Sequence, residues 1–389
     1  QMTLRRGWNI PSNSDLDGSV KNGTLGVSVA LSGDGSLLAA SAPFANNLNG
    51  PRSGHIRFFE RQQQRYIETT GAALLGPSNH TIFGFNLDLA ADGRTLAVIK
   101  SDALSIYHAI QQGSTATLSW RQAFMVETDN FDTHAPGSVA ISADGNTVAW
   151  NVHVDDESRG YVEVYQRVVS DEGDSWKRKG ELLALGTFAG GNAYDKAVGL
   201  SASGNNLVMA GPDNTARMYV WRGGDDLDSG RWVVRGDQVF RSATSVAISG
   251  NGNCLAAGLG GDQNTQVKVY CFAEDDSSQQ VGQTLVGSTS NFGHSLSFSR
   301  GASVLAIGAP WYDVTSSRRD SGQAFIYQFN SATRRWVQTG TLQTAVENDL
   351  YGWSVDLADD GSAMAVGVPF HRGSDLFHSG MAQVANVYL

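Results

Sequence analysis

Residues 27–43 read VSVALSGDGSLLAASAP, and the chain repeats this phrase six more times. The later copies read FGFNLDLAADGRTLAVI (83–99), GSVAISADGNTVAW (137–150), AVGLSASGNNLVMAG (197–211), SVAISGNGNCLAAG (245–258), FGHSLSFSRGASVLAIGAP (292–310) and YGWSVDLADDGSAMAVGVP (351–369). The turn glycines, at intervals of 48 to 60 residues, are Gly35, Gly93, Gly145, Gly204, Gly252, Gly301 and Gly361. Several short strands repeated at about this period are typical of a β-propeller.

Each copy opens with strict alternation, as in Val29/Leu31, which predicts a strand with its large residues on one face. Small residues such as Ser28 and Ala30 occupy the other face, which suits the crowded inner strand of a blade. In five of the seven copies, an Asp-Gly or Asn-Gly turn then leads into a second apolar strand. The inner strands are expected near 27–32, 85–90, 138–142, 197–201, 245–249, 294–299 and 353–358.

The residues that follow the second strand predict a polar loop and then a third strand that ends in an aromatic residue. A fourth strand is expected next, which often starts with an aromatic residue and reaches a glycine a few residues later, as in Trp176…Gly180. The seventh unit stops at Leu389, after its third strand, so residues 3–10 are expected to supply the missing strand and close the ring. The sequence therefore predicts an all-β fold: one domain, residues 1–389, forming a seven-bladed propeller of four-stranded antiparallel blades. Closure would leave no long exposed sheet edge.

Composition restricts the partners. The formal charge is −10, and lysine and arginine are not clustered, so nucleic acid and anionic membrane surfaces are poor partners for this chain. No stretch approaches 18 apolar residues, so direct membrane insertion is not expected. No signal peptide is visible, which is uninformative for a chain that begins with Gln1.

The two cysteines can be placed by strand pairing. Cys254 opens the second strand of the fifth unit and Cys271 closes the third, and a simple hairpin centred near residues 262–263 sets them opposite each other. A cross-strand disulfide is then plausible; the alternative is a pair of thiols in a reducing compartment. Two glycosylation sequons, at Asn22 and Asn79, favour the secretory pathway, although such tripeptides also occur by chance.

The repeated phrase resembles the FG-GAP repeat, the blade unit of the integrin α-subunit propeller and of many secreted relatives. Phe292-Gly293 with Gly308-Ala309-Pro310 is the best match, and the third to fifth units keep only the central strands. The resemblance implies extracellular or cell-surface recognition, including adhesion and protein binding. An organellar lumen or a place in a larger assembly remains an alternative.

One part of that family's pattern is missing. Integrin-type repeats often carry an acidic calcium loop between the first two strands, whereas the turn 32–36 offers one carboxylate, that of Asp34. Calcium needs six to eight oxygen ligands. We therefore expect Asp34, Asp92, Asp144 and Asp360 to stabilise turns, and we expect no metal or other cofactor.

The chain contains no G-x-S-x-G elbow, P-loop, H-E-x-x-H or paired C-x-x-C, so no catalytic residue is assigned. In the seventh-unit loop 370–378, His371, Asp375 and His378 could bind a metal, but their spacing matches no defined site, which favours a solvated loop. Two acidic runs, 155–157 and 225–228, are more often solvated than cation-binding.

The loops between the second and third strands are the candidate binding surface, because they vary most in length and are expected on one side of the ring. The long sixth- and seventh-unit loops, 310–322 and 369–380, are predicted to form one patch; the alternative for their aromatic residues is packing between blades. The candidate binding residues are Trp311, Tyr312, Asp313, Asp320, Phe370, His371 and Arg372.

Three function classes fit these observations. The first is a non-enzymatic recognition propeller that binds a protein or a glycan. The second is a propeller enzyme acting on a polysaccharide at the central channel, which the fold alone does not exclude. A third is a structural subunit. Clustered carboxylates or histidines at the channel mouth would favour the enzyme.

Overall fold

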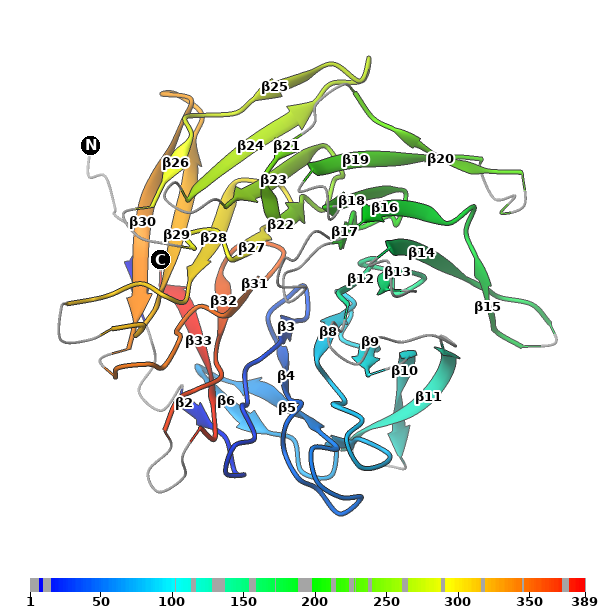
Figure 1. Ribbon diagram of the computed structural model, residues 1–389, viewed down its shortest axis with the longest axis vertical. Helices are drawn as coiled ribbons and strands as arrows, with labels where there is room; N and C mark the ends of the chain where they lie inside the picture. The colour runs from blue at the N-terminus through cyan, green and yellow to red at the C-terminus, as the bar shows by residue number, and fades with distance from the viewer. Residues whose placement is uncertain are drawn as a thin grey trace.

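The computed structural model describes residues 7–9, 15–101, 103–112, 117–127, 137–153, 159–171, 173–187, 198–210, 215–223, 227, 229–236, 240–260, 265–287, 291–315, 319–344, 346–372 and 378–388. In these residues, seven antiparallel sheets are arranged around a central axis as the blades of a β-propeller (Figure 1). None of the described residues forms a helix that is long and apolar enough to cross a membrane.

The blades follow one another along the chain, and each begins at the axis. The inner strands are β3 (Val29–Leu31), β8 (Asn86–Leu89), β12 (Val139–Ile141), β17 (Val198–Leu200), β22 (Ala243–Ile248), β27 (Ser295–Phe298) and β31 (Ser354–Leu357). The second strands are β4 (Leu37–Ala42), β9 (Thr95–Lys100), β13 (Thr147–His153), β18 (Asn206–Ala210), β23 (Cys254–Leu259), β28 (Val304–Ala309) and β32 (Ala363–Val368). The third strands are β5 (His55–Gln62), β10 (Ala103–Gln112), β14 (Arg159–Val168), β19 (Thr215–Arg222), β24 (Gln266–Phe272), β29 (Gln323–Asn330) and β33 (Met381–Tyr388).

The outer strand of most blades is interrupted by a glycine with positive φ, such as Gly180 (81°), and both halves pair with the same third strand. The interrupted outer strands are β6 (Arg65–Glu68) with β7 (Leu74–Leu75), β15 (Ser175–Arg178) with β16 (Leu183–Thr187), β20 (Arg231–Val234) with β21 (Phe240–Arg241), and β25 (Ser278–Gln280) with β26 (Leu285–Val286). Blades 2 and 6 have continuous outer strands, β11 (Thr117–Glu127) and β30 (Arg335–Gln343).

The N-terminal segment closes the last blade. β1 (Gly7–Asn9) pairs with the Asn386–Tyr388 end of β33, and β2 (Asp15–Asp17) pairs with its Met381–Gln383 end. Closure by an N-terminal strand was predicted; of the segment 3–10, residues 3–6 and 10 lie outside the described residues. β2 was not predicted, and it supplies the second half of an interrupted outer strand like those of the other blades.

The hydrophobic core lies between blades. Each cluster of buried residues combines two neighbours; one joins Leu38 and Phe59 of blade 1 to Ala363 and Val384 of blade 7. Blade-to-blade contact therefore carries most of the buried apolar surface, and a missing blade would expose two such faces.

Hydrogen bonds across the inner strands tie the blades together. The Ser28 hydroxyl accepts the amide of Leu87 (3.2 Å), and Asp88 Oδ2 accepts the amide of Ile141 (2.8 Å). At the closure, Asp356 Oδ2 accepts the amide of Leu31 (2.8 Å). The small and acidic residues between the large inner-strand residues therefore satisfy backbone amides of the next blade.

The turns after the inner strands form a second ring. Their backbone amides and carbonyls bond from blade to blade, as Gly33→Ala91 (2.8 Å), Ala91→Ala143 (3.1 Å), Ala143→Ala202 (3.1 Å), Ala202→Gly250 (2.8 Å), Asn251→Arg300 (3.3 Å), Arg300→Asp359 (2.8 Å) and Asp359→Gly33 (2.7 Å). This circuit returns to its start, so one end of the channel is bordered by hydrogen-bonded backbone.

The turn aspartates act within their own turns. Asp34 Oδ1 accepts the amide of Ser36 (2.9 Å), and Asp92, Asp144 and Asp360 each accept the amide two residues on. Burial opposes the ionisation of Asp34, but hydrogen bonds from Ser36 and Ser32 outweigh it and lower the pKa of that carboxyl. The turn-stabilising role predicted for these residues is confirmed.

The sixth turn differs from its prediction. Ala302, with φ of 55°, takes the left-handed position that glycine holds in the other turns, for example Gly35 at 64°. Gly301 instead stands one residue earlier, where Asp34 stands in the first turn. The turn glycine chosen from the sequence was therefore out of register by one residue in this blade.

Candidate functional site

The second strand of each blade separates two faces of the ring. The Asp-Gly turns lie on one side, here called the turn face, and the loops between second and third strands lie on the other, the loop face. On the loop face, the segment entering the next blade crosses the end of the loop. Its amides bond to serine carbonyls: Phe83 to Ser53 (3.2 Å), Tyr351 to Ser321 (2.9 Å) and Leu25 to Ser379 (2.9 Å).

The two long loops predicted to form one patch are joined through Trp353, whose ring lies between Trp311 of one loop and Phe370 of the other. The ring centroid of Trp353 lies 5.5 Å from that of Trp311 and 6.3 Å from that of Phe370. His294 packs edge-on against Trp311 (5.1 Å), and His378 packs edge-on against Phe370 (5.1 Å). All five side chains are half-buried. We call them the aromatic patch.

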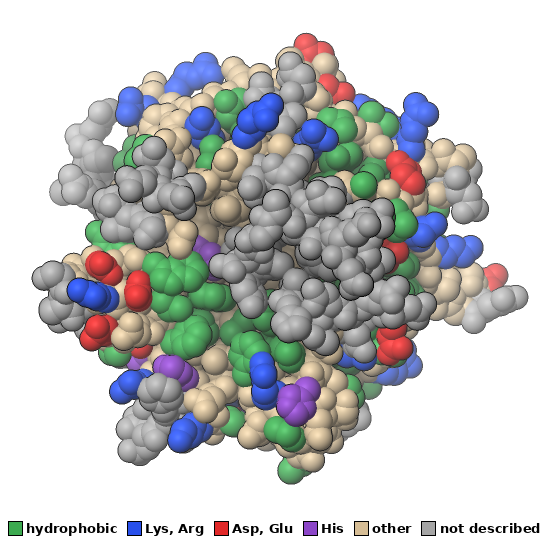
Figure 2. All heavy atoms as spheres, in the orientation of Figure 1, with side chains coloured by type: hydrophobic (Ala, Val, Ile, Leu, Met, Phe, Trp, Pro, Cys, Tyr) green, Lys and Arg blue, Asp and Glu red, His purple; other side chains and the backbone are tan. Residues whose placement is uncertain are grey.

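Trp311, Trp353 and Phe370 of the aromatic patch stand next to the ends of β28, β31 and β32 in the chain. Hydrophobic side chains gather left of centre in Figure 2, over the region of β28, β31 and β32. Because aromatic rings bury a large area at low entropic cost, a surface of this kind is suited to contact with a ligand.

Tyr312 and the two acidic residues of the sixth-blade loop have other contacts. Tyr312 packs edge-on against Phe325 (6.0 Å) and belongs to the core between blades 5 and 6. Asp313 Oδ1 accepts the amide of Asp320 (2.9 Å), which fixes the loop. Burial, together with the Asp313 carboxylate, raises the pKa of Asp320. The structure therefore sets Trp311 in the aromatic patch, while its neighbour Tyr312 packs against the core.

His371 points toward carboxylates of two other segments. Its Nδ1 lies 2.9 Å from Oδ2 of the buried Asp349, and its Nε2 lies 3.9 Å from Oδ1 of Asp17 in β2. The hydrogen bond to Asp349 outweighs partial burial and, with the charges of Asp349, Asp17 and Asp15, raises the pKa of His371. His371 thus connects the seventh-blade loop to the closing strand.

Of the other candidate residues in the seventh-blade loop, the structure describes Arg372 but not Asp375. The Arg372 side chain is exposed. Within the part of the chain that the structure describes, no three histidine, cysteine, aspartate or glutamate side chains are grouped to hold a metal. Arg318 and the acidic runs 155–157 and 225–226, with Asp228, also lie outside that part.

Sequence reasoning missed Trp353 and His294. Each directly follows an aromatic-glycine pair, Tyr351-Gly352 or Phe292-Gly293, at the entry to an inner strand. The same position in blade 2 holds Phe85, which packs edge-on against Phe44 (6.4 Å). The sequence therefore carried a usable signal for this contact. The residue that follows an aromatic-glycine pair packs against the residue that follows the proline at the end of a second strand.

A cavity of about 460 Å³ adjoins the aromatic patch through His378. The Arg52 guanidinium lies 5.1 Å from the centre of the Phe44 ring inside it. The lining residues are Lys21, Asn22, Thr24, Phe44, Asn46, Arg52 and His378. This end of the loop face is polar and basic, in a chain whose formal charge is −10.

Three carboxylates, those of Asp88, Asp356 and Asp359, are among the described residues that line the central channel. Asp88 accepts the amides of Leu89 and Ile141, and Asp356 accepts the amide of Leu31 and the Ser297 hydroxyl. On the turn side, Asp359 pairs with Arg300 at 3.0 Å. No histidine is among the described residues that line the channel.

The cysteines lie in blade 5, and one of the two sequon asparagines, Asn22, lines the cavity beside the aromatic patch. Cys254 and Cys271 face each other in the β23–β24 ladder, as the predicted register required, and the structure joins them in a disulfide. The side chains of Asn22 and Asn79 are both exposed.

Comparison with known proteins finds a solved structure with a similar fold. No protein-family model matches the chain, and no curated protein matches its sequence. The crystal structure of a protein from Lactobacillus plantarum is similar, with a TM-score of 0.53 at 12% identity. The match covers 83% of this chain and 86% of that one. At this identity, the similarity concerns the fold alone.

Proposed function

We propose that this propeller is a non-enzymatic recognition module that binds a protein or a glycan through the aromatic patch of its loop face. The observation that carries the proposal is the meeting of Trp311 and Phe370, from two blades, at Trp353. Half-buried aromatic side chains on a rigid scaffold are the kind of anchor that dominates binding interfaces.

The resemblance to FG-GAP repeats supports the same function, as an extracellular or cell-surface propeller. The disulfide and the two exposed sequon asparagines are consistent with the secretory pathway. Asn22 also lines the cavity beside the patch, so a glycan attached there would compete with a ligand for that cavity.

The channel gives the enzyme alternative no support. Asp88 and Asp356 already accept backbone hydrogen bonds that hold neighbouring inner strands together, and Asp359 is paired with Arg300. A general acid or base must instead be free to exchange a proton with a substrate. The aromatic patch is therefore the better-supported site.

A glycan array together with a panel of cell-surface proteins tests the proposal. The double variant Trp311→Ala/Phe370→Ala should lose signal on every ligand that the wild-type protein binds, with an affinity loss of more than about 1–2 kcal/mol. Val234→Ala/Val337→Ala is the matched control, because both valines are exposed on outer strands (44% and 45%). Equal binding by the two double variants would contradict the proposal, and unfolding of the first would assign its residues to blade packing.

A further inference from the structure

Two buried cations occupy equivalent places in neighbouring blades. Lys179 follows β15 of blade 3 and Arg235 follows β20 of blade 4, each just before a glycine with positive φ. The Lys179 amide bonds to the third strand of its blade at Val164, as the Arg235 amide does at Met218. Lys179 is 2% exposed and Arg235 is 8% exposed.

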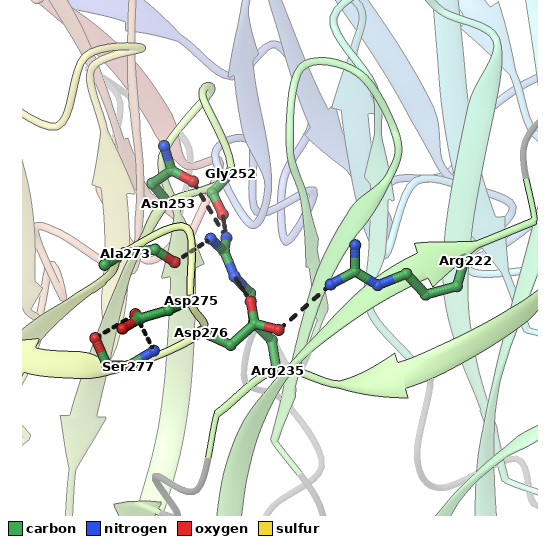
Figure 3. A network of polar contacts seen from close by, with 8 residues as sticks. All are labelled: Arg222, Arg235, Gly252, Asn253, Ala273, Asp275, Asp276 and Ser277. Carbon is green, nitrogen blue, oxygen red and sulfur yellow. Dashed lines mark hydrogen bonds and ion pairs between the residues drawn. The ribbon is translucent and has the colours of Figure 1, made fainter.

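Arg235 joins its blade to the next turn through several acceptors. Its guanidinium donates to the Gly252 carbonyl (3.0 Å), the Asn253 side chain (3.1 Å) and the Ala273 carbonyl (3.1 Å). Its charge is paired with Asp276, whose Oδ1 lies 3.0 Å from Nε. Figure 3 shows Arg222 approaching the same carboxylate from the other side, at 3.3 Å.

Lys179 repeats this arrangement without the carboxylate. Its Nζ donates to the Gly204 carbonyl (3.1 Å) and to Asn205 Oδ1 (2.8 Å), the counterparts of Gly252 and Asn253. It lies 5.3 Å from the Trp221 ring centre, as Arg235 lies 5.5 Å from that of Phe272. Among the described residues, no carboxylate is ion-paired with Lys179. An ammonium has three donors, and these two contacts use two.

A cavity of about 430 Å³ opens beside Lys179, between blades 3 and 4. Polar side chains dominate its lining, which includes Asp144, Arg167, Asn205 and Trp221 beside Lys179. Arg167 is bound to Asp174 at its edge. The cavity thus brings solvent-accessible space to a buried cation that holds only neutral acceptors.

We propose that the cavity beside Lys179 is a carboxylate-binding site on the turn side of the ring, in which an external carboxylate takes the place that Asp276 takes beside Arg235. The carboxylate comes from an acidic side chain of a partner protein or from a small organic acid. The site is independent of the aromatic patch and lies on the opposite face.

Electrostatics and burial agree with this assignment. Burial lowers the pKa of Lys179 to about 8, an effect that the Asp144 carboxylate only partly opposes. Asp144 itself accepts hydrogen bonds from the Asn146 amide and the Ser142 hydroxyl. A carboxylate bound to Lys179 would stabilise the ammonium and raise its pKa again.

The test uses the blocked peptide acetyl-Gly-Gly-Glu-Gly-Gly-amide, its Gln counterpart and sodium acetate, with binding followed by NMR of ¹³C-labelled lysine side chains. The Glu peptide should bind the wild-type protein in the millimolar range and raise the pKa of Lys179, while the Gln peptide should not. Binding of acetate as well would assign a small acid as the ligand, and binding of the peptide alone an acidic side chain.

Substitutions locate the site. Lys179→Met should weaken Glu-peptide binding at least tenfold, and Lys179→Arg, which copies Arg235, should retain it. Asp276→Gly should create a second site beside Arg235, since glycine suits the positive φ of 62° there. Raising the pH from 7 to 9 should weaken wild-type binding about tenfold but leave Lys179→Arg unchanged, because only lysine deprotonates in that range.

Three results would overturn the proposal. The first is the absence of Glu-peptide binding to the wild-type protein. The second is equal binding by Lys179→Met or, if that variant does not fold, equal pH dependence in the wild type and Lys179→Arg. The third is binding that appears only after Asp225→Asn/Asp226→Asn/Asp228→Asn, which would show that the chain's own acids fill the site.

Discussion

The two faces of this ring differ in how far the blades repeat one another. On the turn face, backbone hydrogen bonds run from turn to turn and return to Gly33, with little variation among blades. On the loop face, the loops vary in length, and the aromatic patch occurs at blades 6 and 7. Since every blade needs the same structural support, stability accounts for the repeated backbone circuit, and the irregular loops are where we propose recognition. Substitutions on the two faces should therefore have separate effects.

The largest effect is expected at the outer edge of blade 7, where the N-terminal strands close the last blade. Removing residues 1–17 deletes β1 and β2 and leaves the outer edge of β33 without partners. We expect the free energy of unfolding to fall by more than about 4 kcal/mol, measured by urea denaturation. An unchanged unfolding midpoint would show that the ring does not need this strand.

The second-largest loss of stability is expected from replacing the buried cations Arg235 and Lys179. Arg235→Met removes hydrogen bonds to two backbone carbonyls and leaves Asp276 without its buried partner, so a loss of about 2–4 kcal/mol is expected. Lys179→Met removes a charge that has no carboxylate partner among the described residues and should cost less, about 1 kcal/mol. Equal losses in urea denaturation would contradict the difference drawn between the two positions.

The sequence predicted the turn face better than the loop face. Strand period, the turn glycines of six blades and the facing positions of Cys254 and Cys271 depend on local patterns, and the structure agrees with them. The directions of Trp311 and Tyr312 depend on contacts with other blades, which neighbouring positions in a loop do not reveal. The interrupted outer strand was missed for a related reason: β2 is recognisable only from its pairing with β33.

The sixth turn offers a smaller, stabilising test of the repeat. Ala302→Gly puts glycine at the left-handed position, where the alanine side chain is disfavoured, and should stabilise the fold by up to about 1 kcal/mol. Gly35→Ala makes the opposite change in the first turn and should destabilise by a similar amount or more. Thermal unfolding of both variants measures the effect, and a shift of the same sign in both would refute the account of this turn.

The smallest effect should be the pH dependence of the stability that His371 contributes at the closing strand. Because its folded-state pKa is raised, His371 contributes stability that is present below its ordinary pKa of about 6.5 and is lost as the pH rises through the higher folded-state value. The melting temperature of the wild type relative to His371→Asn should thus be highest near pH 6 and fall toward pH 9. A difference that grows with pH would have the wrong sign.

The most direct test of the central claim is a titration with a ligand identified on the array. It compares Trp311→Ala/Phe370→Ala on the loop face with Arg235→Met on the turn face, and each variant's unfolding is measured under the same conditions. We predict that the first loses more than about 1–2 kcal/mol of binding while remaining folded, and that the second loses stability but binds the ligand with wild-type affinity. Weakened binding by the turn-face variant, with unchanged binding by the loop-face variant, would contradict the account.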